Sequence, residues 1–226
     1  MTTSGCRTLS QPEPHRRSVR PAQTPRWTLL WKRAFDVAVS SAGLLVLWPL
    51  FLLIALLIRL DSKGPVFFRQ ERMGRGMVPF SIFKFRSMVV GAPAQGAAIT
   101  AAGDGRITRL GRLLRHAKID ELPQLINVLR GDMSLVGPRP EVRHYVELFR
   151  EDYEEILTVR PGITDMASLK YRNEAELLSL AADPDQEYRM HVLPDKIRLG
   201  REYARKPSLK LDISLIARTV QAVLRG

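Results

Sequence analysis

The sequence has few residues that could form disulfides or bind metals, and it lacks two common nucleotide-binding motifs. Its single cysteine, Cys6, excludes a disulfide within the chain, and its four histidines lack the spacing of metal ligands. Neither a Walker-type phosphate loop nor the pattern G-x-G-x-x-G is present, so a bound nucleotide must be held by arginines and helix ends. Nothing in the sequence therefore supports a disulfide scaffold or a zinc site.

Acidic residues are outnumbered by basic ones. The 226 residues include 35 lysines and arginines against 23 aspartates and glutamates, which gives a formal net charge of +12. This surplus indicates a polyanionic partner, which could be nucleic acid, an anionic membrane surface or a phosphorylated substrate. The length favours one domain with a single core.

One long stretch has no charge at all. Val37 to Ile58 is 22 residues long, enough for a helix to cross a hydrocarbon core of about 30 Å. A signal peptide does not fit, because the stretch starts late and no small-residue cleavage site follows it. A soluble nucleic-acid-binding protein has no use for such a stretch, so we expect membrane lipids as partners and no nucleic acid. The expected regions are a disordered basic arm (1–30), a membrane helix (31–60) and a cytoplasmic domain (61–226).

The flanks of this membrane helix bear on its topology. Residues 1–36 hold seven lysines and arginines, and five more lie between residues 59 and 75, so both flanks look cytoplasmic under the positive-inside tendency. Pro49 lacks the amide proton of a regular helical turn and favours a kink. A kinked helix that enters and leaves on one face reconciles these observations. A bitopic span that tolerates the proline is the alternative.

Local patterns predict a mostly helical α+β fold for the rest of the chain. Strand-like runs at Val66–Arg72 and Pro79–Phe85 indicate a hairpin, and residues 87–105 look like a mobile loop. Helices are expected over three further stretches, 106–117, 121–130 with Gly131 at its end, and 140–157, with Asn173 and Asp183 capping two more. The apolar residues after position 208 share one helical face, which either lies on the bilayer or packs in the core.

A basic stripe precedes the most informative residues. Arginine or lysine recurs at every third position with no acid among them, at Arg106, Arg109, Arg112, Arg115 and Lys118. On a helix this spacing keeps neighbours on one stripe. The stripe is either a solvated face or a site for an anion or anionic lipid, and we expect Arg106 in its solvated or lipid-facing part.

Two adjacent carboxylates, Asp120 and Glu121, follow this stripe. Asp120 is a good N-cap for the helix that follows, with Glu121 in the first turn. The same position has a chemical use, because a carboxylate at a helix start beside arginines stays ionised. Such a group can attack phosphorus or bind Mg²⁺. The residues alone leave both readings open.

Several motifs, in order, carry a resemblance to a known family. The stretch from Lys32 to Met88, then ITRLGRLLRHAKIDELPQLINVLRGDMSLVGPRPE and RPGIT, resembles the bacterial sugar transferase family, the monotopic phosphoglycosyl transferases. The match runs from about Lys32 to Arg172. It implies a re-entrant membrane helix at the cytoplasmic face of the bacterial inner membrane, and a catalytic domain with amphipathic interfacial helices.

The resemblance also implies an activity. Members move a phosphosugar from a UDP-sugar onto a polyprenol phosphate such as undecaprenyl phosphate, with Mg²⁺, and release UMP at the start of bacterial glycan synthesis. The family's nucleophilic aspartate, which forms a covalent phosphosugar intermediate, matches Asp120, and its glutamate matches Glu121; both are expected at the metal. The implied phosphate-binding residues are Arg115, Arg139, Lys84 and Arg86.

This chain departs from the family pattern in two places. Trp48 stands before Pro49 where members often have serine, so the break angle of the membrane helix does not follow from the resemblance. The chain reads PGITDMASLKYRNEAELL where members often read PGITGWAQ, which we interpret as a subfamily feature near the sugar or in the C-terminal region. The sequence does not determine the sugar, the glycan pathway, the role of residues 173–226 or the oligomeric state, and a homodimer stays open.

Two alternatives belong to other functional classes. One is a non-enzymatic, membrane-tethered protein that binds anionic lipid or nucleic acid through the basic stripe, with strong salt dependence and no need for Asp120. The other is an integral regulator with a true span and an incidental Asp-Glu cap. Release of UMP from a UDP-sugar separates the enzyme from both.

Overall fold

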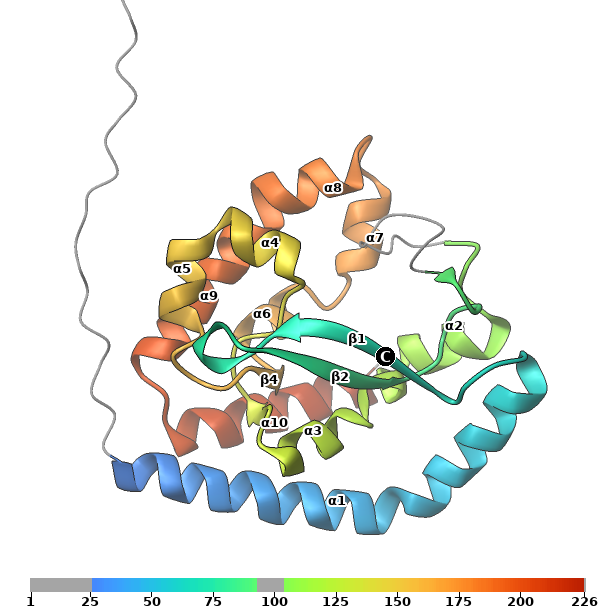
Figure 1. Ribbon diagram of the computed structural model, residues 1–226, viewed down its shortest axis with the longest axis horizontal. Helices are drawn as coiled ribbons and strands as arrows, with labels where there is room; N and C mark the ends of the chain where they lie inside the picture. Colours follow the sequence, from blue (N-terminus) through green and yellow to red (C-terminus); the bar gives the residue numbers. More distant parts are fainter. Residues whose placement is uncertain (1–25, 93–103, 226) are drawn as a thin grey trace, which may run out of the picture.

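The computed structural model describes residues 26–92 and 104–225, which form a mostly helical body with two small sheets. In Figure 1 the long helix α1 runs beneath this body. The elements, in chain order, are α1 (Arg26–Asp61), β1 (Phe67–Met73), η1 (Arg75–Met77), β2 (Pro79–Phe85), α2 (Arg109–His116), η3 (Ile119–Glu121), α3 (Gln124–Arg130), β3 (Ser134–Val136), α4 (Arg143–Leu148), α5 (Arg150–Ile156), β4 (Gly162–Thr164), α6 (Met166–Lys170), α7 (Glu174–Ser179), α8 (Pro184–Glu187), η4 (Tyr188–Val192), α9 (Leu193–Arg205) and α10 (Leu209–Leu224).

Helix α1 carries the predicted membrane stretch. It begins at Arg26, so residues 26–30, which were predicted as part of the arm, are helical; the rest of the arm lies outside the described residues. Among the described residues it is the one helix long and apolar enough to enter a membrane. Its side chains include Leu45, which is 74% exposed. Figure 1 shows α1 bent, and Pro49 lies within it, in agreement with the predicted kink.

Both ends of α1 contact the same body. Near its start, Lys32 Nζ donates a hydrogen bond to Asp212 Oδ2 of α10 at 2.6 Å. Just past its end, Arg86 Nη2 donates to the carbonyl oxygen of Ser62, also at 2.6 Å. These contacts come from elements far apart in the sequence, so they fix the helix to the folded domain at two separate places.

The hairpin of β1 and β2 confirms the predicted pair of strands, with the first strand displaced by one residue. The strands are antiparallel, with Phe67 opposite Phe85. Gly76 in η1 has a φ of 70°, a left-handed conformation that glycine adopts without strain. Of the predicted loop 87–105, residues 93–103 lie outside the described residues, and Met88 pairs with Ile107 in an isolated bridge.

The next two predicted helices both start later than expected. Helix α2 begins at Arg109, because Thr108 caps it and its hydroxyl oxygen accepts a hydrogen bond from the amide of Gly111 at 3.0 Å. Helix α3 begins at Gln124 and ends at Arg130, and the φ of 90° at its C-cap, Gly131, confirms the predicted stop. Glu121, expected in its first turn, lies with Asp120 in the separate 3₁₀ turn η3.

Later elements follow the predictions in part. The stretch 140–157 is two helices, α4 and α5, which meet at the non-helical Phe149. Asp183 caps α8 as predicted and accepts a hydrogen bond from the amide of Asp185 at 3.0 Å. Asn173 occupies the N-cap position of α7, but its side chain makes no capping bond.

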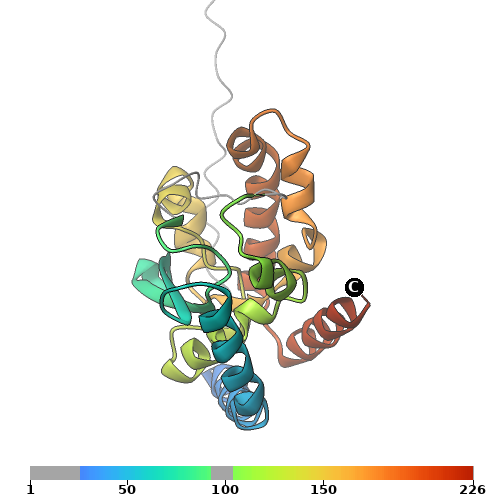
Figure 2. The ribbon, with the colours of Figure 1, turned by 90° about the vertical axis from the view of Figure 1, so that its right-hand side faces the viewer.

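Helix α10 is buried in one part and exposed in another. Leu215 is buried and belongs to a core cluster with Val136 and Tyr203. Val220 and Leu224, near the end of α10, are 53% and 81% exposed. In Figure 2 this end, marked C, projects outward from the body.

Candidate active site

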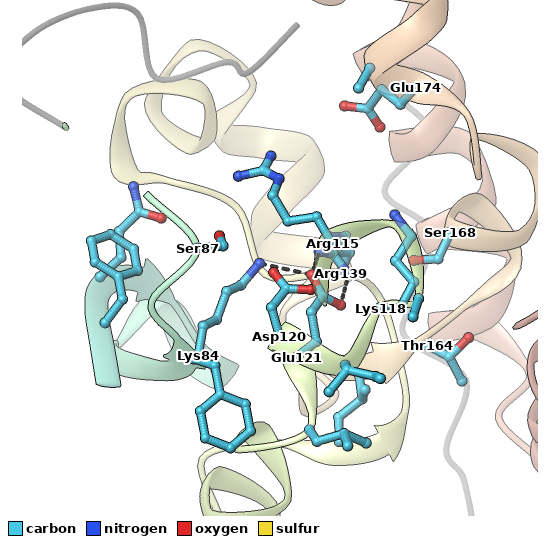
Figure 3. Close-up of a pocket in the computed structure, with 18 of the residues that line it drawn as sticks. Lys84, Ser87, Arg115, Lys118, Asp120, Glu121, Arg139, Thr164, Ser168 and Glu174 are labelled. Carbon is cyan, nitrogen blue, oxygen red and sulfur yellow. Dashed lines mark hydrogen bonds and ion pairs between the residues drawn. The ribbon is translucent and has the colours of Figure 1, made fainter. Parts of the chain in front are cut away.

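A cavity of about 1090 Å³ lies between the hairpin, the turn η3, and helices α6, α7 and α10. One wall, here called the acid wall, carries Asp120 and Glu121 together with Lys84, Arg115 and Arg139. The opposite side, here called the far wall, carries Tyr171, Glu174, Tyr188 and Lys196. Figure 3 shows the acid wall with Glu174 across the cavity. The fold therefore brings the predicted site residues to one space.

The local backbone puts Asp120 and Glu121 in one tight turn. Lys118 ends the preceding segment in a left-handed conformation with a φ of 56°, and the 3₁₀ turn η3 follows directly. The prediction that Asp120 caps the next helix is wrong, because Pro123 occupies the N-cap position of α3 and no side chain caps that helix. The extra turn instead directs both carboxylates toward the cavity.

Glu121 is clamped by two cations. Lys84 Nζ donates to its Oε1 at 2.7 Å. The guanidinium of Arg139 donates to both oxygens, with Nη1 at 3.1 Å from Oε2, and Figure 3 marks these bonds with dashed lines. Burial alone would raise the pKa of Glu121, but the charges and hydrogen bonds of Arg139 and Lys84 hold that pKa well below its usual range. Glu121 is therefore ionised, and both its oxygens are engaged.

Asp120 has a different environment. Its side chain is buried, and no side chain in the described part of the chain donates a hydrogen bond to it. Burial raises the pKa of Asp120, against the opposing charges of Lys84, Arg115 and Lys118. Desolvation is the largest effect on this pKa, ahead of the neighbouring cations on which the sequence-based prediction of an ionised carboxylate relied. A more basic carboxylate with free oxygens is better suited to form a new bond.

The other predicted phosphate-binding residues occupy different places. Arg115 lines the cavity beside the acid pair, and its charge lowers the pKa of Asp120, which burial raises. Arg86 also lines the cavity, but its Nη2 holds the end of α1 through the Ser62 carbonyl. The remaining nitrogens of Arg86, Nε and Nη1, have no hydrogen-bond partner among the described residues.

The basic stripe does not form one helical face. Arg106 precedes α2 and binds Asp104, with Nε at 3.0 Å from Oδ1, so the prediction that it is solvated or faces lipid is corrected. Arg109 and Arg112 are exposed on α2. Arg106, Arg115 and Lys118 line the cavity, whereas Arg109 and Arg112 do not.

The carboxylates offer limited binding for a metal. Among residues 26–92 and 104–225, no group of three or more His, Cys, Asp or Glu side chains is placed to hold an ion. Mg²⁺ often binds one or two carboxylates together with substrate phosphates. Asp120 fits that pattern because its oxygens are free, whereas Lys84 and Arg139 occupy both oxygens of Glu121. The donor set fits an ion shared with a bound phosphate.

Sequence reasoning missed the far wall of the cavity. Tyr171 and Glu174 lie in or beside the segment that departs from the common PGITGWAQ pattern, and that departure was the available signal. No signal in the sequence pointed to Tyr188 or Lys196. Trp48 and Pro49, predicted for the membrane kink, are exposed on α1 and do not line the cavity.

Comparison with known proteins gives consistent matches. The family model described as bacterial sugar transferase matches residues 27–226. A UDP-N-acetylgalactosamine-undecaprenyl-phosphate N-acetylgalactosaminephosphotransferase from Aeromonas hydrophila is 40% identical over 202 residues, 86% of this chain and 44% of that protein. A UDP-glucose:undecaprenyl-phosphate glucose-1-phosphate transferase from Caulobacter vibrioides is 39% identical over 199 residues, 86% of this chain and 70% of that protein.

A third relative is shorter. The exopolysaccharide production protein PSS from Rhizobium leguminosarum is 46% identical over 150 residues, 63% of this chain and 74% of that protein. The chain spans less than half of the Aeromonas protein, but the family match covers nearly all of the described residues. The chain belongs to the bacterial sugar transferase family.

Proposed function

We propose that this chain transfers a sugar phosphate from a UDP-sugar to undecaprenyl phosphate, or a similar polyprenol phosphate, through a covalent intermediate on Asp120. The relatives named for this transfer support the substrates, and the Rhizobium relative, named for exopolysaccharide production, supports a role in making such a polysaccharide. The observation that carries the mechanism is the contrast within the acid pair. Glu121 is held by two cations, while Asp120 has free oxygens that face the same cavity.

The reaction then consists of two displacements at one phosphorus atom. An oxygen of Asp120 attacks the phosphorus that bears the sugar, the bond from that phosphorus to the bridging oxygen breaks, and UMP leaves with the electron pair. An oxygen of the polyprenol phosphate next attacks the same phosphorus, and the carboxylate of Asp120 leaves. The carboxylate is thereby regenerated, so the kinetics are expected to be ping-pong.

The cations of the acid wall neutralise the negative charge of the substrate. Lys84, Arg115 and Arg139 offset the charge of the donor diphosphate as it approaches a carboxylate. Glu121 positions Lys84 and Arg139 through the hydrogen bonds described above. Mg²⁺, when bound at Asp120 and the phosphates, would supply further neutralisation of the leaving UMP.

The first displacement can be tested without a lipid acceptor. Enzyme mixed with UDP-sugar and Mg²⁺ should release at most one UMP per active site and gain the mass of one phosphosugar. Peptide mass spectrometry should place the adduct on Asp120. An adduct on another residue, or multiple UMP released with no covalent species, contradicts the mechanism.

We also propose that α1 is a re-entrant helix at the cytoplasmic face of the bacterial inner membrane. Both its ends are tied to one folded body, through Lys32 with Asp212 and through Arg86 with Ser62. A bitopic span would place one of those ends on the other side of the bilayer. The exposed apolar residues near the end of α10, Val220 and Leu224, support contact with the interface.

Cysteine labelling tests this topology. In a Cys6→Ser background, single cysteines at Ser18 and Lys63 should both be protected from a membrane-impermeant thiol reagent added to the periplasmic side. Both should react once the cytoplasmic face is exposed. Labelling of either one alone from the periplasm contradicts the re-entrant helix. Pro49→Ala is expected to straighten α1 and shift some molecules toward a span.

A further inference from the structure

The far wall of the cavity has no role in the displacements described above. It is built by the segment from Tyr171 to α7 and by η4 and α9, which supply Glu174, Tyr188 and Lys196. Figure 3 places Glu174 across the cavity from Asp120. The wall therefore faces whatever occupies the space beside the acid pair.

Lys196 and Glu174 form a fixed pair on this wall. The Lys196 side chain is only 10% exposed, and its Nζ makes an ion pair with Glu174. The same Nζ lies 4.8 Å from the ring centroid of Tyr188 and 6.0 Å from that of Tyr171. Packing and charge thus hold one strong donor and one strong acceptor side by side at the cavity surface.

The charge of Glu174 reaches Arg139 on the acid wall. The charge of Glu121 raises the pKa of Arg139, and the charge of Glu174 adds to that effect from the other side. A group bound at Arg139 is therefore within electrostatic reach of Glu174. A second negative phosphate would be repelled by Glu174, whereas a neutral polar group would not.

We propose that Glu174 and Lys196 recognise the sugar of the donor, with the carboxylate accepting a hydrogen bond from one hydroxyl and the ammonium donating to its neighbour. This inference rests on the proposed function and names a specificity site for it. The relatives are named for different sugars, N-acetylgalactosamine and glucose.

The alternative occupant of this wall is the uracil base, and the aromatic rings argue against it. A base stacks on an open aromatic face. Tyr188 is 3% exposed with Lys196 over its ring, and the ring of Tyr171 has Lys170 Nζ at 5.4 Å as well as Lys196. The far wall therefore offers charged donors and acceptors, which suit hydroxyls, and covered ring faces, which do not suit a base.

The test compares two donors that differ in the configuration of one hydroxyl, UDP-glucose and UDP-galactose, with UMP as an inhibitor. In Glu174→Gln and Lys196→Met, kcat/KM for the better donor should fall by about ten- to a hundred-fold. The ratio of kcat/KM between the donors should move toward one. The inhibition constant for UMP, which contains the uridine of the donor but lacks its hexose, should stay unchanged.

A matched control lies on the same helix as Lys196. Arg205 of α9 pairs with Glu155 of α5, and neither lines the cavity. Arg205→Met therefore removes a cation–carboxylate pair away from the far wall, and it should leave the donor ratio unchanged. Thermal unfolding of every variant, together with the conservative Glu174→Asp and Lys196→Arg, separates a lost contact from a failure to fold.

The outcomes distinguish this inference from the proposed function. If the wild type forms the Asp120 adduct but the far-wall variants keep the donor ratio, the sugar assignment is wrong and the function stands. If UMP inhibition weakens in step with donor use, the wall binds uridine. If the wild type releases no UMP from any UDP-sugar, the function and this inference fail together.

Discussion

The two walls of the cavity use the same kinds of charged residue in opposite ways. On the acid wall, three cations surround two carboxylates, and Asp120 is left without a hydrogen-bonding side chain among the described residues. On the far wall, Glu174 is matched by Lys196. An unpartnered buried carboxylate costs stability and remains reactive. A carboxylate in an ion pair is less reactive, and it can still accept hydrogen bonds from a neutral ligand.

The largest effect is expected from removing the reactive member of the acid wall. Asp120→Asn should abolish the UMP burst, the covalent adduct and turnover, because an amide neither ionises nor attacks phosphorus. Since burial raises the pKa of Asp120, its charged form is costly, and the variant should unfold at the same temperature as the wild type or a higher one. Full activity in Asp120→Asn would overturn the nucleophile assignment.

Glu121→Gln should damage both catalysis and stability. The change leaves Lys84 and Arg139 without their shared counterion, and loss of one partner of a buried ion pair typically costs about 3–5 kcal/mol. Turnover should fall by roughly a hundred-fold, since charge-assisted contacts are worth about 1.5–3 kcal/mol, yet the adduct on Asp120 should still form. Thermal unfolding and single-turnover UMP release check the two effects. Loss of activity with no loss of stability would contradict the clamp.

Arg139→Ala tests the cations with a matched surface control. A charge-assisted phosphate contact is worth about 1.5–3 kcal/mol, a ten- to hundred-fold loss in kcat/KM. Arg112→Ala, on the exposed side of α2, should change kcat/KM by less than about two-fold because it reaches no cavity residue. Similar small losses in both variants would count against a substrate role for Arg139.

The smallest effect concerns the carboxylate of Asp195, beside the far wall. Hydrogen bonds from Lys170 and Arg198 hold the pKa of Asp195 at about 2, below its usual 3.8. Its contribution to stability is therefore full above pH 3.8 and is lost as the pH falls through about 2. Asp195→Asn should lower stability at pH 6 by on the order of 0.5 kcal/mol, because its partners are half exposed. Denaturant titrations should show this difference shrinking below pH 4.

The sequence predicted those helix and strand boundaries that are set by residues close together in the chain. The hairpin follows from alternating strand residues, the end of α3 from Gly131 in a left-handed conformation, and the start of α8 from Asp183 before a proline. The turn η3 was missed because Asp120 also fits an N-cap pattern. Whether Pro123 or Asp120 begins the helix depends on packing that no short window contains.

Contacts between distant segments could not be predicted in this way. The clamp on Glu121 joins β2, η3 and the loop after β3, and the pair of Glu174 and Lys196 joins α7 to α9. The motif resemblance pointed to Asp120, Glu121, Lys84 and Arg139 as a set. It carried no information about the far wall, where this chain departs from the common pattern.

Under the proposed topology, insertion of α1 requires no charged flank to be translocated. Both ends of the helix remain attached to the folded body, at Asp212 and at Arg86. A span would carry the basic flank of one end against the membrane potential, at about 2.3 kcal/mol per charge for each 100 mV. Biogenesis of this protein should therefore tolerate dissipation of the membrane potential, and a completed chain should be able to join the bilayer from the cytoplasm after synthesis.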